Sequence, residues 1–236
     1  MEIEIDFVAV RRLTSREYGQ ARQEIASLGI AAAFAQSQQR HDERLASAAD
    51  APALACKAGC SWCCHFSVDV RAVEAFRILD YVREHFSLAE QERVRQEIAK
   101  NSLEVAPLDD LERMKRTVRC PFLVEGRCSI YPVRPQTCRN YHATDAAGCQ
   151  KSYEEPDNLD IDPEFAPLVY QAGGAHVEAF ARAMEDAGFD VTAYELNVAL
   201  TAAMTEPASR ERFEAGQAPF ESTQGDEVPS EFMEER

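Results

Sequence analysis

Eight cysteines are the residues of this sequence with the clearest capacity for chemistry. They lie in two segments, Cys56, Cys60, Cys63 and Cys64 in the first and Cys120, Cys128, Cys138 and Cys149 in the second. Thiolates are the ligands that hold zinc ions and iron–sulfur clusters in proteins. In a reducing compartment, clustered thiols are more typical of metal ligands or catalytic groups than of disulfides. We therefore expect all eight cysteines to be metal ligands.

The spacing of the first segment favours a multi-metal centre. Cys60 and Cys63 form a C-x2-C pair, which a tight turn can aim at one ion or cluster, and Cys56 can supply a third ligand. Cys64 directly follows Cys63, and adjacent side chains point in different directions. Cys64 would therefore contact a second metal atom or another edge of a cluster, or remain a buried apolar thiol. We favour an iron–sulfur cluster of the 4Fe-4S type over Zn²⁺, because the thiols exceed the ligands of one tetrahedral zinc.

Charge and hydropathy limit the partners. The 236 residues include 41 acidic and 25 basic ones, a formal net charge of -16, which repels nucleic acid and anionic lipid headgroups. No window reaches the roughly 18 apolar residues of a membrane span, and the first residues are acidic where a secretory signal is basic. We expect a cytoplasmic protein with a metal as its partner and with neither nucleic acid nor membrane. A protein partner or substrate is left open.

The hydrophobic periodicity predicts a mainly α fold with one small cysteine-rich metal-binding lobe. We expect one helical domain over residues 1–216, carrying metal-binding segments at 56–64 and 120–149, and a disordered acidic tail at 217–236. Helices running out and back between the two segments would bring them together as one composite centre. The expected elements begin with a strand at 2–10 and a helix that runs from a capping box of Thr14 and Glu17 to about Ala49. A second capping box, of Ser87 and Glu90, opens a helix at 87–103. Further helices are expected at 69–86, 108–116, 163–187 and 192–205, and a β-hairpin turning at Glu125 and Gly126.

Two stretches, "CKAGCSWCC" and "CPFLVEGRCSIYPVRPQTCRNY", resemble a bacterial cysteine-cluster family described as zinc- or iron-chelating, whose hallmark is CxxCxxCC. The resemblance covers residues 56–149 and includes the C-P-F-L, C-x-I-Y and R-P-x-x-C-R stretches of that family. One departure is the three residues between Cys56 and Cys60, where the family pattern has two. The resemblance implies a metal or iron–sulfur site with a structural, electron-transfer or sensing role. A related cysteine module in flagellin lysine N-methylases makes an iron–sulfur-dependent protein lysine methyltransferase the alternative, so whether the chain is an enzyme is left open.

A radical S-adenosylmethionine enzyme is a weaker alternative. "CKAGCSWC" matches the C-x3-C-x-aromatic-C arrangement that holds the cluster in such enzymes. Those enzymes place the motif after the first strand of a parallel barrel. Here a helical pattern precedes the motif and no alternation of strands and helices follows.

Basic and aromatic residues flank the cysteines. A four-thiolate centre carries a net charge of about minus two, which a protein interior must compensate. Arg134 and Arg139 bracket Cys138, and we expect both to lie beside the cofactor. For His65 and His142 we prefer a place beside the site or on the surface to a ligand role. The remaining histidines, His41, His85 and His176, are predicted to face solvent.

Overall fold

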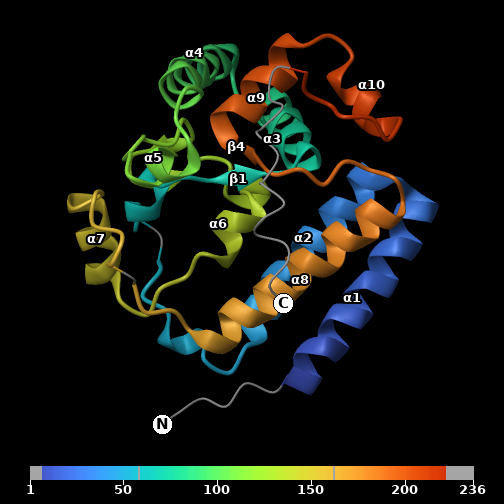
Figure 1. Ribbon diagram of the computed structural model, residues 1–236, viewed down its shortest axis with the longest axis horizontal. Helices are drawn as coiled ribbons and strands as arrows, with labels where there is room; N and C mark the ends of the chain where they lie inside the picture. Colours follow the sequence, from blue (N-terminus) through green and yellow to red (C-terminus); the bar gives the residue numbers. More distant parts are fainter. Residues whose placement is uncertain (1–6, 58, 162, 222–236) are drawn as a thin grey trace.

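The computed structural model describes residues 7–57, 59–161 and 163–221 and confirms the mainly α fold. Figure 1 shows its helices around the short strands β1 and β4. The α-helices are α1 (Phe7–Leu28), α2 (Ile30–Ser47), α3 (Ala72–His85), α4 (Leu88–Val105), α5 (Asp110–Met114), α6 (Gln136–Asn140), α7 (Ala146–Glu154), α8 (Pro167–Asp186), α9 (Leu196–Thr205) and α10 (Ser209–Glu214). The 3-10 helices are η1 (Ala51–Ala53), η2 (Trp62–His65) and η3 (Tyr131–Val133), and the strands are β1 (Asp69–Val70), β2 (Leu123–Val124), β3 (Arg127–Cys128) and β4 (Tyr194–Glu195).

The expected N-terminal strand is wrong where the structure describes it. Residues 7–10 open α1, and Phe7 and Val8 are largely exposed; residues 2–6 lie outside the described residues. Thr14 does not cap a helix, because its hydroxyl donates to the Val10 carbonyl at 3.0 Å within α1. The expected single helix to Ala49 is two helices, separated at Gly29, whose φ of +80° favours glycine.

Three long helices form one layer of the fold. α1 packs along α8, and α2 contacts both. Ile25, Phe34 and Phe180 lie in the buried core beneath them, with the two phenylalanine rings 5.4 Å apart. Helix α6, which carries Cys138, contacts both α2 and α8 of this layer.

A second group of helices continues the same core. α9 packs against α3 and α4, and α10 contacts α9. α3 buries Val73, Phe76 and Val82 on one face, as the periodicity predicts. The predicted capping box of α4 is present, since Ser87 and Glu90 each bond the other's backbone amide.

The strands form two short antiparallel ladders. β1 pairs with β4, with Asp69 opposite Glu195 and Val70 opposite Tyr194, while β2 and β3 form the predicted hairpin. Both named sheets of the described residues are antiparallel, so they provide no parallel barrel for a radical S-adenosylmethionine enzyme. Among the described residues, none of the helices combines the length and the apolarity that crossing a bilayer requires.

The predicted tail begins too early at residue 217. Phe220 is buried, with its ring centroid 5.9 Å from that of Phe76 and 5.0 Å from that of Tyr194. Residues 217–221 therefore belong to the packed domain, and residues 222–236 lie outside the described residues. The sequence suggested a tail because one aromatic residue among polar ones carries little periodicity.

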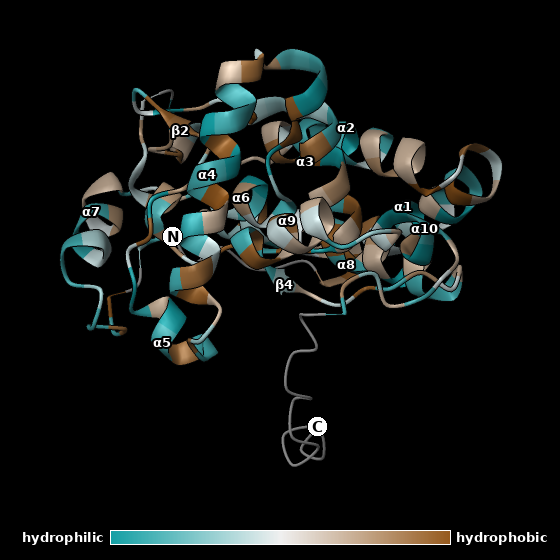
Figure 2. Cartoon of the chain, turned by 90° about the horizontal axis from the view of Figure 1, so that it is seen from above, coloured by the Kyte–Doolittle hydropathy of each residue, from teal (hydrophilic) through white to brown (hydrophobic). Residues whose placement is uncertain are grey.

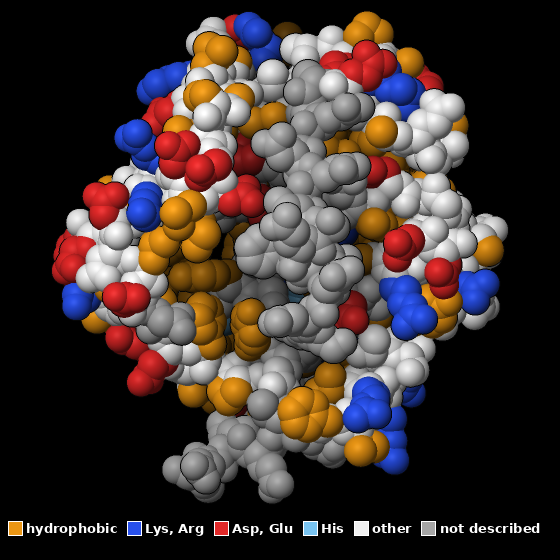
Figure 3. Space-filling model, viewed as in Figure 1, with side chains coloured by type: hydrophobic (Ala, Val, Ile, Leu, Met, Phe, Trp, Pro, Cys, Tyr) orange, Lys and Arg blue, Asp and Glu red, His pale blue; other side chains and the backbone are white. Residues whose placement is uncertain are grey.

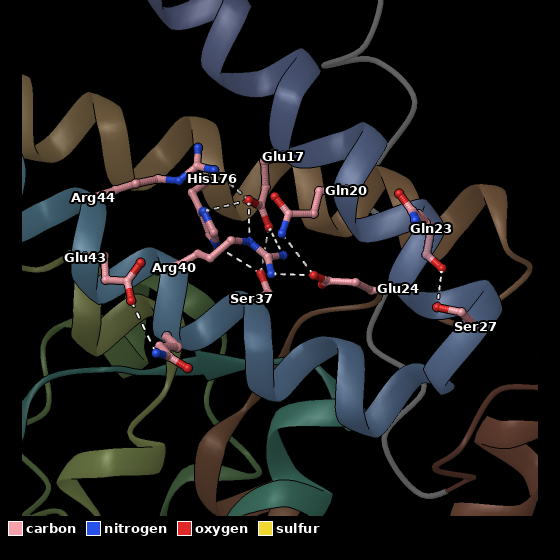
Figure 4. A network of polar contacts seen from close by, with 11 residues as sticks. Glu17, Gln20, Gln23, Glu24, Ser27, Ser37, Arg40, Glu43, Arg44 and His176 are labelled. Atoms are coloured by element: carbon pink, nitrogen blue, oxygen red, sulfur yellow. Dashed lines mark hydrogen bonds and ion pairs between the residues drawn. The ribbon is translucent and has the colours of Figure 1, made fainter.

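A buried carboxylate joins the long helices (Figure 4). Glu17 of α1 is fully buried and accepts hydrogen bonds from Arg40 at 2.7 and 3.0 Å and from Arg44 at 2.7 Å. Ser37 also donates to Glu17 at 3.1 Å, and its oxygen lies 2.8 Å from His176 Nε2. A buried charge with so many partners ties α1 to α2 and α8.

Two histidines predicted to face solvent are buried instead. His41 and His176 have no exposed surface, and their rings stack at 4.8 Å; the exposed His85 behaves as expected. Burial lowers the pKa of His41 to about 2, with a contribution from His176. Burial likewise lowers the pKa of His176 to about 3, and Arg44 and Arg40 act in the same direction. Both imidazoles are therefore neutral in the folded protein.

The surface carries charges of both signs together with an apolar region. Figure 3 shows acidic and basic side chains over the visible face, and hydrophobic ones gathered between the positions that α5 and α7 occupy in Figure 1. In Figure 2, α7 and β2 lie at one end of the molecule, beyond α4 and α6. The cysteine segments belong to this end.

Replacing Phe220 with alanine is expected to lower the free energy of unfolding by about 3–5 kcal/mol, because a buried aromatic side chain is removed from the core. Urea denaturation measures the loss. Phe7→Ala is the matched control, since Phe7 is 64% exposed and should change stability by less than about 0.5 kcal/mol. Equal effects of the two substitutions would contradict the packing described for residues 217–221.

Acidification is expected to destabilise the fold through the buried histidines. In the unfolded chain a histidine takes up its proton near pH 6.5, whereas His41 and His176 stay neutral until about pH 2 and 3. Protonation between these values favours the unfolded state, so each histidine costs about 2 kcal/mol of stability between pH 7.5 and pH 5. Urea denaturation of His41→Gln at both pH values should recover about this amount, with metal content followed in parallel. His85→Gln is the control, and an unchanged pH slope in His41→Gln would refute the assignment.

Candidate metal centre

The first cysteine segment is a chain of short turns between α2 and β1. The Cys60 amide donates to the Lys57 carbonyl at 2.9 Å, and the Cys64 amide donates to the Ser61 carbonyl at 3.1 Å. Gly59, with φ at +93°, lies within the first of these turns in a conformation that side chains disfavour. Cys63 and Cys64 then fall in η2. The predicted turn-rich segment is therefore confirmed.

Backbone hydrogen bonds bring the two cysteine segments together. The Cys120 amide donates to the Cys64 carbonyl at 2.8 Å, and the Val118 amide donates to the His65 carbonyl at 2.9 Å. At the other end of the site, the Ala55 amide donates to the Ala143 carbonyl at 2.9 Å. The segments thus lie side by side over their length, which is the arrangement that a composite site requires.

The second segment folds back on itself through the hairpin. Glu125 and Gly126 both have positive φ, at 49° and 75°, as a tight two-residue hairpin turn demands. Cys128 of β3 lies opposite Leu123 of β2, and the buried Phe122 beside it belongs to the main core. The hairpin therefore carries Cys128 back toward Cys120.

Four cysteines, which we call the inner cysteines, interact electrostatically with one another: Cys64, Cys120, Cys128 and Cys138. Cys120, Cys128 and Cys138 also pack against the main core. Burial raises the pKa of Cys120 to about 12, and the thiolates of Cys64 and Cys128 raise it further. Burial also raises the pKa of Cys138, with contributions from Cys120, Cys128 and Cys64. Thiols that are buried together in this way ionise readily only when a metal cation binds to their sulfur atoms and stabilises the thiolates.

Three further thiols, which we call the outer cysteines, lie toward α7: Cys56, Cys60 and Cys149. The amide of Ala143 lies 3.4 Å from the Cys56 sulfur. Burial raises the pKa of Cys149 to about 11, and the thiolates of Cys56 and Cys60 add to the shift. Cys56 is exposed, so this part of the site reaches solvent.

Cys63 lies between the inner and outer cysteines. A hydrogen bond between the Cys63 and Cys64 thiols raises the pKa of Cys63 and lowers that of Cys64. Cys63 also interacts electrostatically with Cys138 and with Cys56. Arg119 further lowers the pKa of Cys64, which makes this thiol the most readily ionised neighbour of Cys63.

The donor set fits a thiolate-bound metal in its chemistry. All eight cysteines are free thiols, which are soft ligands suited to zinc or iron. Within the described ranges, no three His, Cys, Asp or Glu side chains stand in an arrangement that would hold a metal ion as they are. A metal held by these cysteines would therefore require their side chains to rearrange on a backbone that already joins the two segments.

The arginines predicted to lie beside the cofactor have other partners. Arg139 is fully buried, forms an ion pair with Asp42 of α2, and donates to the Arg134 carbonyl at 3.1 Å. Arg134 also pairs with Asp42, at 3.2 Å, and stacks over the ring of Tyr131. Burial raises the pKa of Cys128, and both guanidinium groups oppose this rise. Their contact with a cofactor stays a prediction, while their part in joining α6 to α2 is evident.

Aromatic side chains of α7 and of the first cysteine segment pack against each other. Tyr153 of α7 lies with its ring 5.3 Å from that of Trp62 and 4.8 Å from that of His65. His65 Nδ1 is also 3.2 Å from the Ser61 carbonyl oxygen. These contacts join α7, which the sequence analysis did not predict, to the first cysteine segment.

Two positioning residues escaped the sequence analysis. Glu74 of α3 is buried and accepts from the Gln136 amide at 2.8 Å, which fixes the start of α6 and hence Cys138. Gly173 of α8 leaves room for Asn140, since an added Cβ would stand 1.6 Å from the Asn140 Oδ1. The glycine pair in "QAGGAH" signals this close approach, whereas Glu74 has no signal beyond its place in a helix.

Replacing Asp42 with asparagine is expected to lower the free energy of unfolding by about 1–3 kcal/mol, because the buried Arg139 loses its charged partner. Metal content per chain should not change, since Asp42 acts on the arginines. Urea denaturation and elemental analysis measure the two quantities, with the exposed Asp157→Asn as the control. Loss of metal in Asp42→Asn at unchanged stability would instead assign the arginines to the cofactor.

Comparison with known proteins gives one finding. Residues 55–160 match the family model CxxCxxCC, described as a "putative zinc- or iron-chelating domain". This range contains both cysteine segments, α3 to α7 and the hairpin. Searches of curated proteins and of solved structures each returned no match.

Proposed function

Because the chain carries a CxxCxxCC domain over residues 55–160, we propose that it binds metal through thiolates of both cysteine segments. The ligands are drawn from all eight cysteines, and the metal is an iron–sulfur cluster rather than zinc. The domain description supports chelation of zinc or iron. The choice between them, and the role of the site, are our proposal.

The observation that carries the proposal is the hydrogen bond from the Cys120 amide to the Cys64 carbonyl. This bond supports the proposal because it joins the backbone of one cysteine from each segment, and all eight cysteines are free thiols. Packing eight thiols together offers little in hydrophobic burial that alanine or valine would not offer. A shared cation explains why thiols occupy these positions.

Iron is favoured by the number and arrangement of the thiols. A single tetrahedral zinc uses four ligands, and adjacent cysteines such as Cys63 and Cys64 rarely serve one ion together. Iron–sulfur clusters spread their ligands over several irons and accept wider separations between sulfurs. Arg119 lowers the pKa of Cys64, which also suits an anionic cluster.

A combined structural and electron-transfer or sensing role agrees with the placement of the site. Three of the inner cysteines, Cys120, Cys128 and Cys138, pack against the main core, so a metal bound there would stabilise the fold. Cys56 is exposed, so the outer edge is open to small redox molecules or to a protein partner. A purely structural site would have no need of this opening.

Anaerobic purification of the whole chain is expected to give a brown protein with a broad visible absorption band and with iron and acid-labile sulfide. Replacing Cys60, Cys63, Cys120 and Cys138 together with serine should give a colourless protein without metal, because both segments lose ligands. Elemental analysis and absorption spectroscopy measure these outcomes.

Two results would change the proposal in different ways. A colourless protein with stoichiometric zinc would retain metal binding and reject the cluster. A wild-type protein without any metal, also after anaerobic reconstitution with ferrous iron and sulfide or with zinc, would reject metal binding altogether.

A further inference from the structure

We infer that the eight cysteines form two separate metal centres. One is held by the inner cysteines, Cys64, Cys120, Cys128 and Cys138, and the other by Cys56, Cys60, Cys63 and Cys149. This inference rests on the proposed metal binding and specifies its stoichiometry. It differs from the single composite centre that the sequence favours.

The inner set is assembled by backbone contacts at the core. The hydrogen bond from the Cys120 amide fixes Cys64 beside Cys120, and the hairpin returns Cys128 to the same side. α6 then brings Cys138, held by the bond from the Gln136 amide to Glu74. Three of these four cysteines pack against the main hydrophobic core.

The outer set is assembled by different elements. The backbone bond between Ala55 and Ala143 places Cys56 next to the approach to α7. α7 begins after Asp145, whose carboxylate caps its first turn, and it carries Cys149. Tyr153 of the same helix contacts Trp62 of η2, so α7 closes over the first segment from outside the core.

The 3-10 helix η2 lies at the junction of the two sets. Cys63 and Cys64 are consecutive in η2, and their thiols are hydrogen-bonded to each other. The backbone bond from the Cys120 amide joins Cys64 to the second segment at the core. The C-x2-C spacing assigns Cys63 to Cys60 and the outer set, which leaves Cys64 to Cys120 and the inner set.

The electrostatic interactions among the thiols agree with this division. Burial raises the pKa of Cys138, and the thiolates that add to the shift belong to the inner set. Burial raises the pKa of Cys149, and the thiolates that add to it, Cys56 and Cys60, belong to the outer set. Cys63, at the junction, interacts with members of both.

Each set of four thiolates matches the ligand count of one tetrahedral zinc or one four-iron cluster. The expected content of the whole chain is therefore about two zinc ions or about eight irons. Cys128→Ser should remove the inner centre and Cys149→Ser the outer one, each lowering metal content to about half. The double variant should hold none. Elemental analysis, protein quantitation by amino-acid analysis and far-ultraviolet circular dichroism provide the measurements.

Two further variants guard against loss of the fold. Val124→Ala, at an exposed position of the hairpin, is the control that should keep the full content. Cys56→Ser replaces an exposed thiol and should lose the outer centre alone. If Cys128→Ser does not fold, the metal content of the wild-type protein and of Cys56→Ser distinguishes two centres from one.

The outcomes separate this inference from the proposed function. A wild-type content of one zinc or one cluster, or single variants that lose all metal together, would overturn the two-centre arrangement and leave metal binding intact. A wild-type protein that binds no metal would overturn both. Half content in each single variant and none in the double variant would support the division.

Discussion

One hydrogen bond, from the Cys120 amide to the Cys64 carbonyl, sets the arrangement on which the site depends. It joins two turns that are separated in sequence by α3, α4 and α5, and it lies where the inner cysteines meet. Closing so long a loop has an entropic cost, which the packing of the intervening helices offsets before any ligand binds. The backbone around the cysteines is therefore organised by protein contacts. A bound metal would determine only the final positions of the sulfur atoms.

The helical layer reaches into the cysteine lobe through polar contacts more than through apolar ones. Asp42 of α2 pairs with the buried Arg139 of α6, and Asn140 of α6 fits over Gly173 of α8. The adjoining histidines, His41 and His176, are buried and neutral. Such contacts are directional, so they fix the position of α6 more precisely than apolar packing alone would.

The sequence predicted the helices whose apolar residues recur regularly and the hairpin whose turn contains glycine. The Ser87 capping box and the face of α3 followed the expected pattern. Errors arose where tertiary contacts override local pattern. The alternation of apolar and charged residues at the N-terminus predicts a strand, although residues 7–10 belong to α1. His41 and His176 are expected to face solvent because their neighbours in sequence are polar, but both are buried. The convergence of the cysteine segments could be expected from loop closure, but the backbone bonds that join them, such as that from the Cys120 amide to the Cys64 carbonyl, could not, because they depend on tertiary packing.

The partners of α6 lie on both sides of the stretch that matches the family model. Asp42 and Gly173 fall before and after residues 55–160, yet they hold Arg139 and Asn140 within it. A fragment cut at residues 55 and 160 would lack Asp42, the counter-ion of Arg139, and Gly173, against which Asn140 of α6 packs. The stretch that matches the family model is therefore shorter than the stretch that packs around α6, because α2 and α8 supply the partners of Arg139 and Asn140.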